Sequence, residues 1–303
     1  MPDQLVLVTG AAGGSQGKTG RHVSAMLLAR GIPVRAFVHK IDERSEYLRQ
    51  IGAEVFAGDF LDPQSVLKAV EGVFSVYFAY PVQEGLLDAT AIMAIAARQA
   101  GVRRLINLVM LLSSLDAPTP RMRQNYLSEQ IFEWAGIGVA HLRATIFYEN
   151  VRALVRLSLA SQGPLRLPWG NESTRVSLVA AEDVARVAVG LLTKPDVSPG
   201  SAYPLIGAVL TLGDILATLS RVLNREVRYQ EVSEEEWRTS ALARGTNLHA
   251  VEHLSNLWHA IRLAGSGRET SRWAVTDTIE ELGGAKPKTF EEFVREEQSA
   301  LIS

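Results

Sequence analysis

The sequence predicts an α/β fold built on a doubly wound parallel sheet. Three observations predict it. Over the first 145 residues, short apolar runs alternate with segments of helical spacing. The runs are rich in Val, Ile and Leu with little polar alternation, as in strands that are buried on both faces. A glycine-rich loop follows the first run. Because strand–helix alternation implies right-handed crossovers, we expect a Rossmann sheet of at least six parallel strands with helices on both sides.

The elements of this first half follow one another without interruption. The predicted strands are Leu5–Thr9, Val34–Val38, Glu54–Ala57, Phe74–Tyr80, Leu105–Leu112 and Val139–Thr145. The helices predicted between them are Thr19–Arg30, Arg44–Ile51, Pro63–Val70, Leu86–Ala100 and Arg123–Trp134.

After residue 146 the pattern loosens, which indicates a smaller C-terminal α/β lobe. The Gly- and Pro-containing stretch Ser161–Trp169 is typical of a loop. We expect a first domain over residues 1–150 and a smaller lobe over residues 151–303, some segments of which return to the first domain. The elements predicted in this half are helices over Glu182–Thr193, Thr211–Leu223, Ser233–Arg244 and Thr289–Ala300 and a strand over Glu226–Gln230.

Composition limits the class of function. The chain has 303 residues, of which 47% are hydrophobic and 21% charged, which excludes a disordered or collagen-like protein. A formal charge of −2 gives no general attraction to nucleic acid or anionic membranes, so we expect neither as a partner. No apolar run approaches the ~20 residues of a membrane span, and the N-terminus lacks a basic leader, so we expect a cytoplasmic protein. Without cysteine, redox chemistry has to come from a bound cofactor.

The strongest chemical signal is the loop in VLVTGAAGGSQGKTGRHV, between the first strand and the first helix. Its glycines permit positive φ angles and close approach of the backbone, and N–H groups at a helix N-terminus attract an anion. In the first turn of a βαβ unit, this arrangement predicts a site for a dinucleotide pyrophosphate. The candidate residues are Gly10, Gly13, Gly17, Lys18 and Thr19.

An alternative interpretation of the same loop is a P-loop, because AGGSQGKT (residues 12–19) fits a relaxed form of that pattern. The strict pattern requires Gly where Ala12 stands. A P-loop enzyme also needs an Asp at the end of a later strand to hold Mg²⁺. The strand Leu105–Leu112 is followed instead by Ser113 and Ser114. The dinucleotide site is therefore favoured.

The end of the second strand distinguishes NAD from NADP. NAD sites place Asp or Glu there for the ribose 2′-hydroxyl, whereas this chain has His39 and Lys40, with Asp42 nearby. A cation at this position favours a 2′-phosphate, so we expect NADP(H) rather than NAD(H). After the third strand, Asp59 is a candidate to accept from the adenine amino group and Phe60 to pack on the ring.

Together these pieces resemble the NmrA-like family of atypical short-chain dehydrogenase/reductases, over nearly the whole chain. The glycine loop carries a few more residues than the GATGxxG that is usual in that family. The resemblance is carried, in order, by VTGAAG and GKTGRHV, VRAFVHK, AEVFAGDFLD, YFAYP, AGVRRLINL, AGIGVAHLRATIFYENV, VSLVAAEDVARVAVGLL and TDTIEELGGAKPKTFEEFV.

The resemblance implies a Rossmann half that binds NADP(H) in a cleft beside a small C-terminal lobe. It also implies that His39 stands where the family usually has Arg. It places Ala79, Tyr80 and Pro81 along the nicotinamide ribose, and Phe147, Tyr148, Glu149 and Asn150 beside the nicotinamide and the substrate.

The tyrosine acid of short-chain reductases is not evident in this chain. Those enzymes use Tyr in a YxxxK pair, in which Lys lowers the tyrosine pKa, with a hydroxyl nearby. Here Tyr126 is followed four residues later by Gln130, and residues 121–134 contain no lysine. Tyr126 and Tyr148 are therefore the candidate acids, with Tyr80 as a third phenol.

This absence favours an acceptor that needs no strong acid. Hydride addition to a simple ketone builds charge on oxygen, whereas quinones, azo compounds and conjugated enones delocalise that charge themselves. We therefore expect an oxidoreductase that reduces such a conjugated small molecule with NADPH. Two alternatives remain: a non-enzymatic NADP(H)-sensing regulator with a protein partner, and a biosynthetic tailoring enzyme whose reaction is not a simple reduction.

One further motif, His249–Glu252–His253, matches the HxxEH pattern of some metalloproteases. Two histidines at this spacing share a helix face, but a third ligand and a catalytic scaffold are needed as well. We therefore predict no metal site and interpret His253 and Trp258 as neighbours of the substrate.

Overall fold

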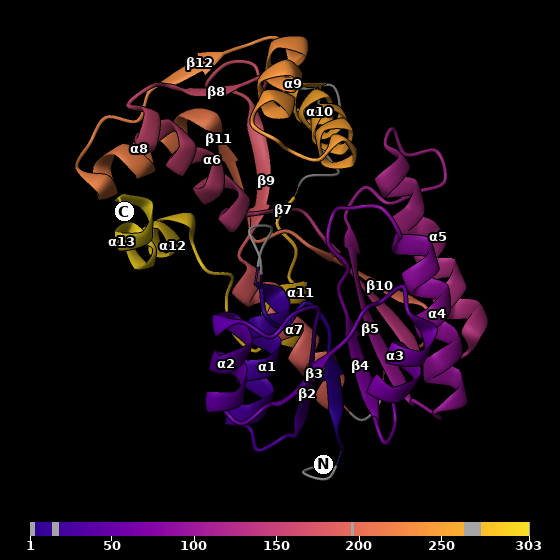
Figure 1. Cartoon of the computed structure of the whole chain (residues 1–303). Coiled ribbons are helices and arrows are strands. Elements are labelled where there is room, and N and C mark those ends of the chain that lie inside the picture. Colours follow the sequence, from indigo (N-terminus) through magenta and orange to yellow (C-terminus); the bar gives the residue numbers. More distant parts are fainter. Residues whose placement is uncertain (1–3, 14–17, 195–196, 264–273, 303) are drawn as a thin grey trace.

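A seven-stranded parallel sheet occupies the centre of the molecule (Figure 1). In the computed structural model, which describes residues 4–13, 18–194, 197–263 and 274–302, the strand order is β10–β6–β5–β4–β1–β2–β3. This confirms the predicted doubly wound Rossmann sheet. Its strands are β1 (Val6–Val8), β2 (Val34–Val38), β3 (Glu54–Ala57), β4 (Ser75–Phe78), β5 (Arg104–Met110), β6 (Val139–Ala144) and β10 (Ser201–Leu205).

Both faces of the sheet are covered by helices, which explains why the strand sequences are apolar without alternation. Leu7 and Val76 pack into the core under α3, α4 and α5, whereas Val8 and Tyr77 pack into the core under α1 and α7. The helices of the two faces are α1 (Thr19–Ala29), α2 (Glu43–Gln50), α7 (Ala181–Thr193) and α11 (Thr278–Gly283) on one side, and α3 (Pro63–Ala69), α4 (Leu86–Gln99) and α5 (Pro120–Ala135) on the other.

Local capping fixes where several of these helices begin. Asp62 accepts from the N–H of Gln64 at 3.1 Å and is followed by Pro63, a residue suited to the first helical position. Thr119 and Pro120 start α5 in the same way, and Thr119 Oγ1 accepts from the N–H of Met122 at 3.0 Å. The predicted start of α5 at residue 123 is therefore wrong by one turn.

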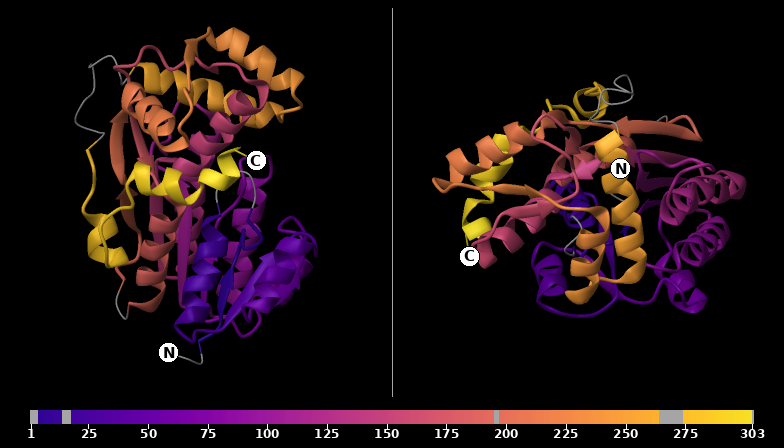
Figure 2. Two further views of the ribbon diagram at one scale, coloured as in Figure 1. Left: turned by 90° about the vertical axis from the view of Figure 1, so that its left-hand side faces the viewer. Right: turned by 90° about the horizontal axis from the view of Figure 1, so that it is seen from above.

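The C-terminal lobe stands above the carboxyl ends of the central strands, and from above its helices lie across that edge (Figures 1 and 2). Its core contains Trp169, Trp237 and Trp258, with Trp258 in ring contact with both others. Its elements are β7 (Ile146–Phe147), α6 (Tyr148–Ser161), β8 (Leu165–Leu167), β9 (Arg175–Val179), β11 (Ala208–Thr211), α8 (Leu212–Leu223), β12 (Tyr229–Glu231), α9 (Glu234–Ala243), α10 (Leu248–Leu263), α12 (Phe290–Glu296) and α13 (Gln298–Ile302).

The second half of the chain also contributes to the Rossmann half. β10 pairs in parallel with β6 at the edge of the central sheet, and α7 packs against α1. Several elements depart from the sequence expectation. The predicted loop Ser161–Trp169 contains β8, which pairs with β12, and the predicted tail helix is divided into α12 and α13. Within the described part of the chain, none of the helices combines the length and apolar character that crossing a bilayer requires.

Candidate cofactor and substrate site

The candidate site begins at the carboxyl end of β1, where the chain turns into α1. Thr9 Oγ1 accepts from the N–H of Ala79 at 2.7 Å and donates to its carbonyl at 3.1 Å, which ties the ends of β1 and β4 together. Gly10 and Gly13 have φ angles of +62° and +69°, and the Gly13 N–H donates to the Gly10 carbonyl at 3.1 Å. A Cβ atom on Gly20 would lie 2.4 Å from the Thr9 carbonyl oxygen. Glycine is therefore required both for the turn and for the close approach of α1.

The N-terminus of α1 has the features of an anion site. Its N-cap residue, Lys18, makes no side-chain capping hydrogen bond to the first N–H groups of the helix. Those N–H groups, including that of Thr19, carry the positive end of the helix dipole. The residues fit a dinucleotide pyrophosphate, which Gly10, Gly13, Lys18 and Thr19 would hold. The remaining predicted residue of this loop, Gly17, lies outside the described residues.

Basic side chains surround the end of β2. His39 and Lys40 follow the strand directly and are exposed. Arg44 donates from Nη1 to the carbonyl of Gly13 at 2.9 Å and from Nε to Asp42 at 3.0 Å. The other Asp42 oxygen caps α2 by accepting from the Arg44 N–H at 2.9 Å, and the hydrogen bond from the Arg44 side chain lowers the pKa of Asp42. Asp42 is thus engaged within α2.

Arg44 is a candidate site residue that sequence reasoning missed. It lies 31 residues from Gly13 along the chain, and only the fold brings its guanidinium to the glycine turn. The available signal was its position in the first turn of the helix that follows β2, where a side chain can reach the β1–α1 loop.

The two candidates after β3 are placed near this edge. Asp59 is exposed, and its Oδ1 accepts from the N–H of Leu61 at 2.9 Å. Phe60 is half-buried, with its ring centroid 4.7 Å from that of Phe37 and 5.6 Å from that of Tyr80. The contact with Tyr80 holds Phe60 beside the segment that follows β4. The residues predicted to contact the adenine and those predicted to contact the nicotinamide ribose therefore lie at the same edge of the sheet.

The segment after β4 is fixed by its own hydrogen bonds. Ala79 and Tyr80 are half-buried, and Pro81 is exposed. The Tyr80 hydroxyl donates to the Glu84 carbonyl at 2.8 Å, so this phenol is already used within its own turn. The Tyr80 carbonyl accepts from Arg121 Nη2 at 2.9 Å, which links the segment to α5.

The junction of β7 and α6 separates residues that the sequence had grouped. Phe147 and Asn150 are half-buried, whereas Tyr148 is 0% exposed. The Tyr148 hydroxyl donates to the Lys288 carbonyl at 3.1 Å, and burial raises the tyrosine pKa. The ring of Tyr148 lies in the core of the C-terminal lobe and its proton is engaged, which argues against the predicted role of Tyr148 as an acid.

The other candidate acid, Tyr126, lies elsewhere. It is half-buried on α5. The hydrogen bond that Arg143 of β6 donates to Glu129 is the largest cause of the raised Arg143 pKa, and the nearby Tyr126 raises it further. Arg143 Nη2 lies 2.6 Å from the Glu129 carboxylate. Tyr126 thus lies on α5 near β6, whereas Tyr148 lies in the core of the C-terminal lobe, and the role of Tyr126 stays a prediction.

The hydroxyls at the ends of β5 and β6 are also engaged. Ser113 Oγ donates to the Met110 carbonyl at 2.6 Å, and Thr145 Oγ1 donates to the Ser177 carbonyl at 3.0 Å. Each hydroxyl therefore donates its proton within the protein and not to a ligand.

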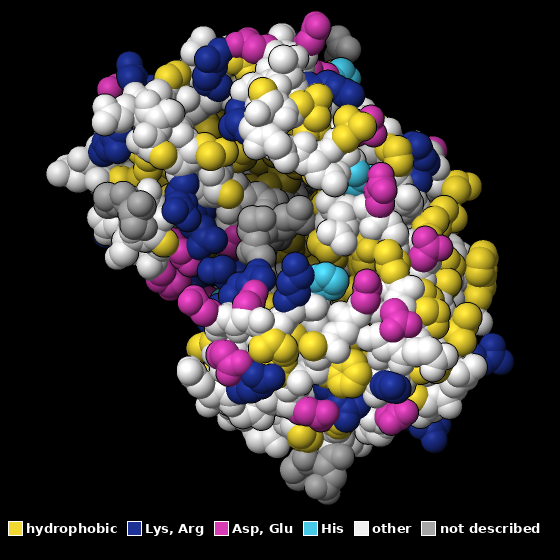
Figure 3. Space-filling model, in the orientation of Figure 1, with side chains coloured by type: hydrophobic (Ala, Val, Ile, Leu, Met, Phe, Trp, Pro, Cys, Tyr) yellow, Lys and Arg dark blue, Asp and Glu magenta, His cyan; other side chains and the backbone are white. Residues whose placement is uncertain are grey.

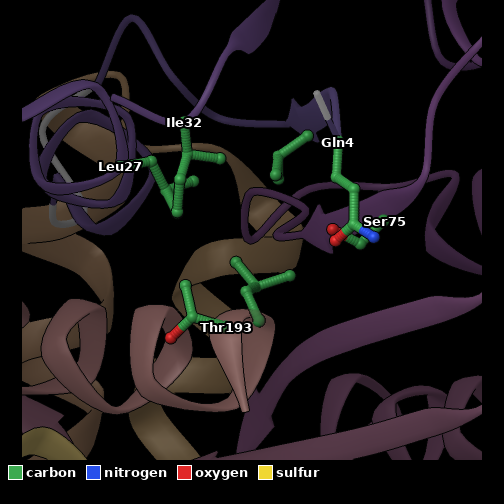
Figure 4. A pocket seen from close by; sticks show the side chains of 7 residues that line it. Gln4, Leu27, Ile32, Ser75 and Thr193 are labelled. Atoms are coloured by element: carbon green, nitrogen blue, oxygen red, sulfur yellow. The ribbon is translucent and has the colours of Figure 1, made fainter. Parts of the chain in front are cut away.

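A hollow opens between the Rossmann half and the C-terminal lobe, and basic side chains and histidine border it (Figure 3). By contrast, a small cavity of about 10 Å³ lies at the amino ends of β1 and β4, between Gln4, Leu27, Ile32, Ser75 and Thr193 (Figure 4). It has room for about one water molecule and lies at the edge opposite to the glycine turn.

In the described part of the chain, no group of three or more His, Asp or Glu side chains is arranged to hold a metal ion.

Comparison with known proteins identifies relatives over the full length. The model of the NmrA-like family matches residues 2–294. An NAD(P)H azoreductase of Xenophilus azovorans is 26% identical over 98% of this chain and 99% of its own length. A (4-alkanoyl-5-oxo-2,5-dihydrofuran-3-yl)methyl phosphate reductase of Streptomyces griseus subsp. griseus is 29% identical over 98% of this chain and 99% of its own length.

Solved structures show the same fold. An NADPH-dependent quinone oxidoreductase from Escherichia coli, complexed with NADPH, has a TM-score of 0.79 at 20% identity and covers 99% of this chain and 100% of its own. The Citrobacter sp. triphenylmethane reductase, complexed with NADP(H), has a TM-score of 0.78 at 24% identity, with 97% and 99% covered. Nmra, a negative transcriptional regulator in complex with NAD, has a TM-score of 0.78 at 21% identity, with 99% and 98% covered. The family match argues against the P-loop interpretation of the glycine loop.

Proposed function

This chain belongs to the NmrA-like family, and from that premise we propose that it uses NADPH to reduce an electron-poor, conjugated small molecule such as a quinone, an azo compound or an enone. It is an oxidoreductase, as are the azoreductase and the furanyl-methyl phosphate reductase that align with it from end to end. One observation carries the proposal: a glycine turn suited to a dinucleotide lies at a sheet edge where the hydroxyls of Tyr80, Ser113 and Thr145 are already hydrogen-bonded to backbone carbonyls.

The engaged hydroxyls limit the acceptors that can react. Reduction of a simple ketone requires a positioned acid near the developing alkoxide, and such an acid contributes ~10²–10⁴-fold. Tyr80 and Tyr148 both donate to backbone carbonyls instead. A conjugated acceptor spreads the added charge over its own atoms and takes its proton from water, so the protein has mainly to position it.

The residues near the second strand support NADPH over NADH. The carboxylate that would accept from a ribose 2′-hydroxyl is Asp42, and it is engaged by Arg44. Lys40 and Arg44 supply positive charge at the same place, and a guanidinium binds a phosphate with two parallel hydrogen bonds. We therefore infer that Arg44 and Lys40, with His39, hold the 2′-phosphate.

The remaining residues would orient the cofactor. A bound NADPH supplies the hydride. Gly10, Gly13 and the N-terminus of α1 would hold its pyrophosphate, and Ala79, fixed by Thr9, would border the nicotinamide ribose. Phe147, half-buried at the end of β7, would close the opposite side.

The direct test is a calorimetric titration with NADPH, NADH and Mg·ATP, followed by NADPH oxidation with matched acceptors. We expect NADPH to bind more tightly than NADH and much more tightly than Mg·ATP. We also expect a naphthoquinone or an azobenzene to be reduced and an unactivated aliphatic ketone to be inert. Absence of NADPH binding would refute the proposal. Tight NADPH binding without turnover of any conjugated acceptor would favour an NADP(H) sensor instead.

A further inference from the structure

Arg121 is a buried cation that has no carboxylate partner among the residues that the structure describes. It lies in the first turn of α5 and is 3% exposed. Its Nη1 donates to the Gln83 carbonyl at 3.1 Å and its Nη2 to the Tyr80 carbonyl at 2.9 Å, both neutral acceptors. Its Nε is buried and has no partner among the described residues. Burying a charge without a counter-ion is costly, and here it lowers the pKa of Arg121 to about 10.

Two histidines of α10 lie close enough to this guanidinium for its charge to lower their pKa values. His249 and His253 are one helical turn apart and so share a face of α10. Burial is the largest cause of the lowered pKa of each histidine, and the charge of Arg121 is the second. His249 Nε2 is buried and, like Arg121 Nε, has no hydrogen-bond partner in the described part of the chain. Two buried nitrogen atoms, one from the Rossmann half and one from the C-terminal lobe, are therefore left without a partner among the described residues, and such atoms are normally paired in a folded protein.

The neighbouring residues hold α10 in this position. His253 Nδ1 lies 3.3 Å from Thr119 Oγ1, the N-cap of α5, so the C-terminal lobe contacts the Rossmann half directly beside Arg121. Arg121 is also bound to the segment that follows β4, whose Ala79 is tied to the glycine turn by Thr9. The unsatisfied nitrogens thus lie at the carboxyl edge of the sheet, on the side of the α4–α5 helices.

The charges around the histidines favour an anion over a cation. Glu84 and Glu252 raise the pKa of His249, each by less than Arg121 lowers it. Glu252 lies 3.8 Å from Arg238, which offsets its charge. A metal ion between the two histidines would be repelled by Arg121, whereas an oxyanion would accept from Arg121 and His249 and neutralise the buried charge.

We propose that Arg121 and His249 bind an oxyanion carried by the acceptor, namely a carboxylate, a sulfonate or a phosphate. The substrate class is then a conjugated molecule with an anionic group set apart from the atoms that are reduced. This inference rests on the proposed function, because the oxyanion site lies at the edge where the acceptor would meet the cofactor. His253 acts as a positioning residue that holds α10 over α5.

The test uses a carboxylated azobenzene and its methyl ester as matched ligands of the NADP⁺ complex. We expect the wild type to bind the carboxylate at least ~10-fold more tightly than the ester by calorimetry. Arg121→Gln and His249→Gln should weaken carboxylate binding by roughly 10- to 100-fold and ester binding by less than about 3-fold. Arg123→Gln is the control, because Arg123 also lies on α5 and donates to a backbone carbonyl, that of Ala117 at 2.7 Å.

Sulfonate and phosphonate analogues of the same azobenzene identify which oxyanion fits. Arg121→Lys keeps the charge if Arg121→Gln does not fold, and it should retain part of the carboxylate preference. Equal affinity of the wild type for carboxylate and ester would overturn the inference, as would an equal loss for both ligands in the Arg121 and His249 variants. Because affinity is measured without turnover, failure of the inference is distinct from failure of the proposed function, which would show as absent NADPH binding or as no reduction of either ligand.

Discussion

Arg44 Nη1 donates to the Gly13 carbonyl oxygen at 2.9 Å, which joins the first turn of α2 to the loop between β1 and α1. The same guanidinium donates from Nε and Nη2 to a single oxygen, Oδ2, of Asp42. A positive charge is therefore held between the glycine turn and the end of β2. In a doubly wound fold the adenosine half of a dinucleotide crosses this place, so the contact links the loop to the choice between NADP and NAD.

Replacing Arg44 should reduce the preference for NADPH. Arg44→Gln removes the charge but keeps a donor for the Gly13 carbonyl, so we expect NADPH affinity to fall by roughly 10-fold and NADH affinity by less than about 2-fold. Calorimetric titration of both dinucleotides measures the two losses. Arg49→Gln is the matched control, because Arg49 lies on the same helix and pairs with Glu46. Equal losses for the two dinucleotides would exclude Arg44 from the phosphate site.

Replacing His39 and Lys40, which are exposed directly after β2, should also reduce the preference for NADPH. We expect His39→Ala with Lys40→Ala to weaken NADPH binding far more than NADH binding, because both side chains are exposed and free to reach a phosphate. The difference should shrink as salt rises, since exposed charges are screened within about 10 Å at 0.1 M. Titrations at low and high salt check this. A salt-independent loss would mean that the variant alters the loop rather than the charge.

Gly13 should be essential for dinucleotide binding. Its φ of +69° and the lack of a side chain let the turn meet a phosphate, so Gly13→Asp should abolish measurable NADPH binding while the fold persists. Gly31→Asp is the control for backbone strain, because Gly31 has a similar φ of +71° but lies in open space just after α1. It introduces the same strain and the same charge away from the glycine turn. That control should lose about 1 kcal/mol of unfolding free energy and bind NADPH normally. Circular dichroism and calorimetry measure both effects, and unchanged binding in Gly13→Asp would move the pyrophosphate elsewhere.

The tyrosines should be dispensable for turnover. Tyr126→Phe should change kcat by less than about 3-fold with a quinone acceptor, and Tyr148→Phe should cost about 1 kcal/mol of unfolding free energy through the lost bond to Lys288 without lowering kcat. A loss of ~100-fold or more in kcat for Tyr126→Phe would restore a tyrosine acid to the mechanism. Steady-state kinetics and thermal melts of the same preparations give both readouts.

The sequence was most informative where structure is locally determined. β2 and β3 have the predicted bounds because their apolar runs are bounded by charged and turn residues, and α3 follows from Asp62 and Pro63. The edge strand β10 was not predicted, because its alternate residues are exposed and it contains Pro204. Proline is tolerated there because an edge strand has one side that makes no ladder hydrogen bonds.

The candidate site was predicted less completely than the fold. The glycine turn is local, so its residues could be identified from the loop alone. Arg121 contacts Tyr80 across 41 residues, and the histidine of α10 whose pKa its charge lowers, His253, comes from the C-terminal lobe. The burial of Tyr148 could not be predicted for the same reason, because its partners Lys288 and Phe290 come from the end of the chain. No periodicity in α6 distinguishes a side chain facing the cleft from one facing the lobe core.

The family resemblance places Glu149 beside the nicotinamide. In the structure, Glu149 of α6 in the C-terminal lobe contacts the start of α7 in the Rossmann half. Its carboxylate accepts from the Ala181 N–H at 3.2 Å, at the start of α7, which has no capping side chain of its own. The side chain is 5% exposed, and burial raises its pKa to about 7 from an ordinary value of 4.5, against the opposing effect of the Ala181 hydrogen bond. The folded protein therefore holds this proton over a range in which the unfolded chain has released it.

Glu149 should make the protein less stable as pH rises. Below pH 4.5 the group is protonated in both states and contributes nothing; between about 4.5 and 7 only the unfolded chain ionises, so the free energy of unfolding falls; above pH 7 the full loss remains. At about 1.4 kcal/mol per pKa unit, that loss is roughly 3 kcal/mol. Glu149→Gln keeps an acceptor for Ala181 without the charge, so its stability relative to the wild type should increase by this amount between pH 4.5 and 8. Urea unfolding across this range measures the difference, with Glu235→Gln on the exposed start of α9 as a control that should follow the wild type. A difference between Glu149→Gln and the wild type that does not change with pH would show that this carboxylate is ionised at its contact with α7 throughout.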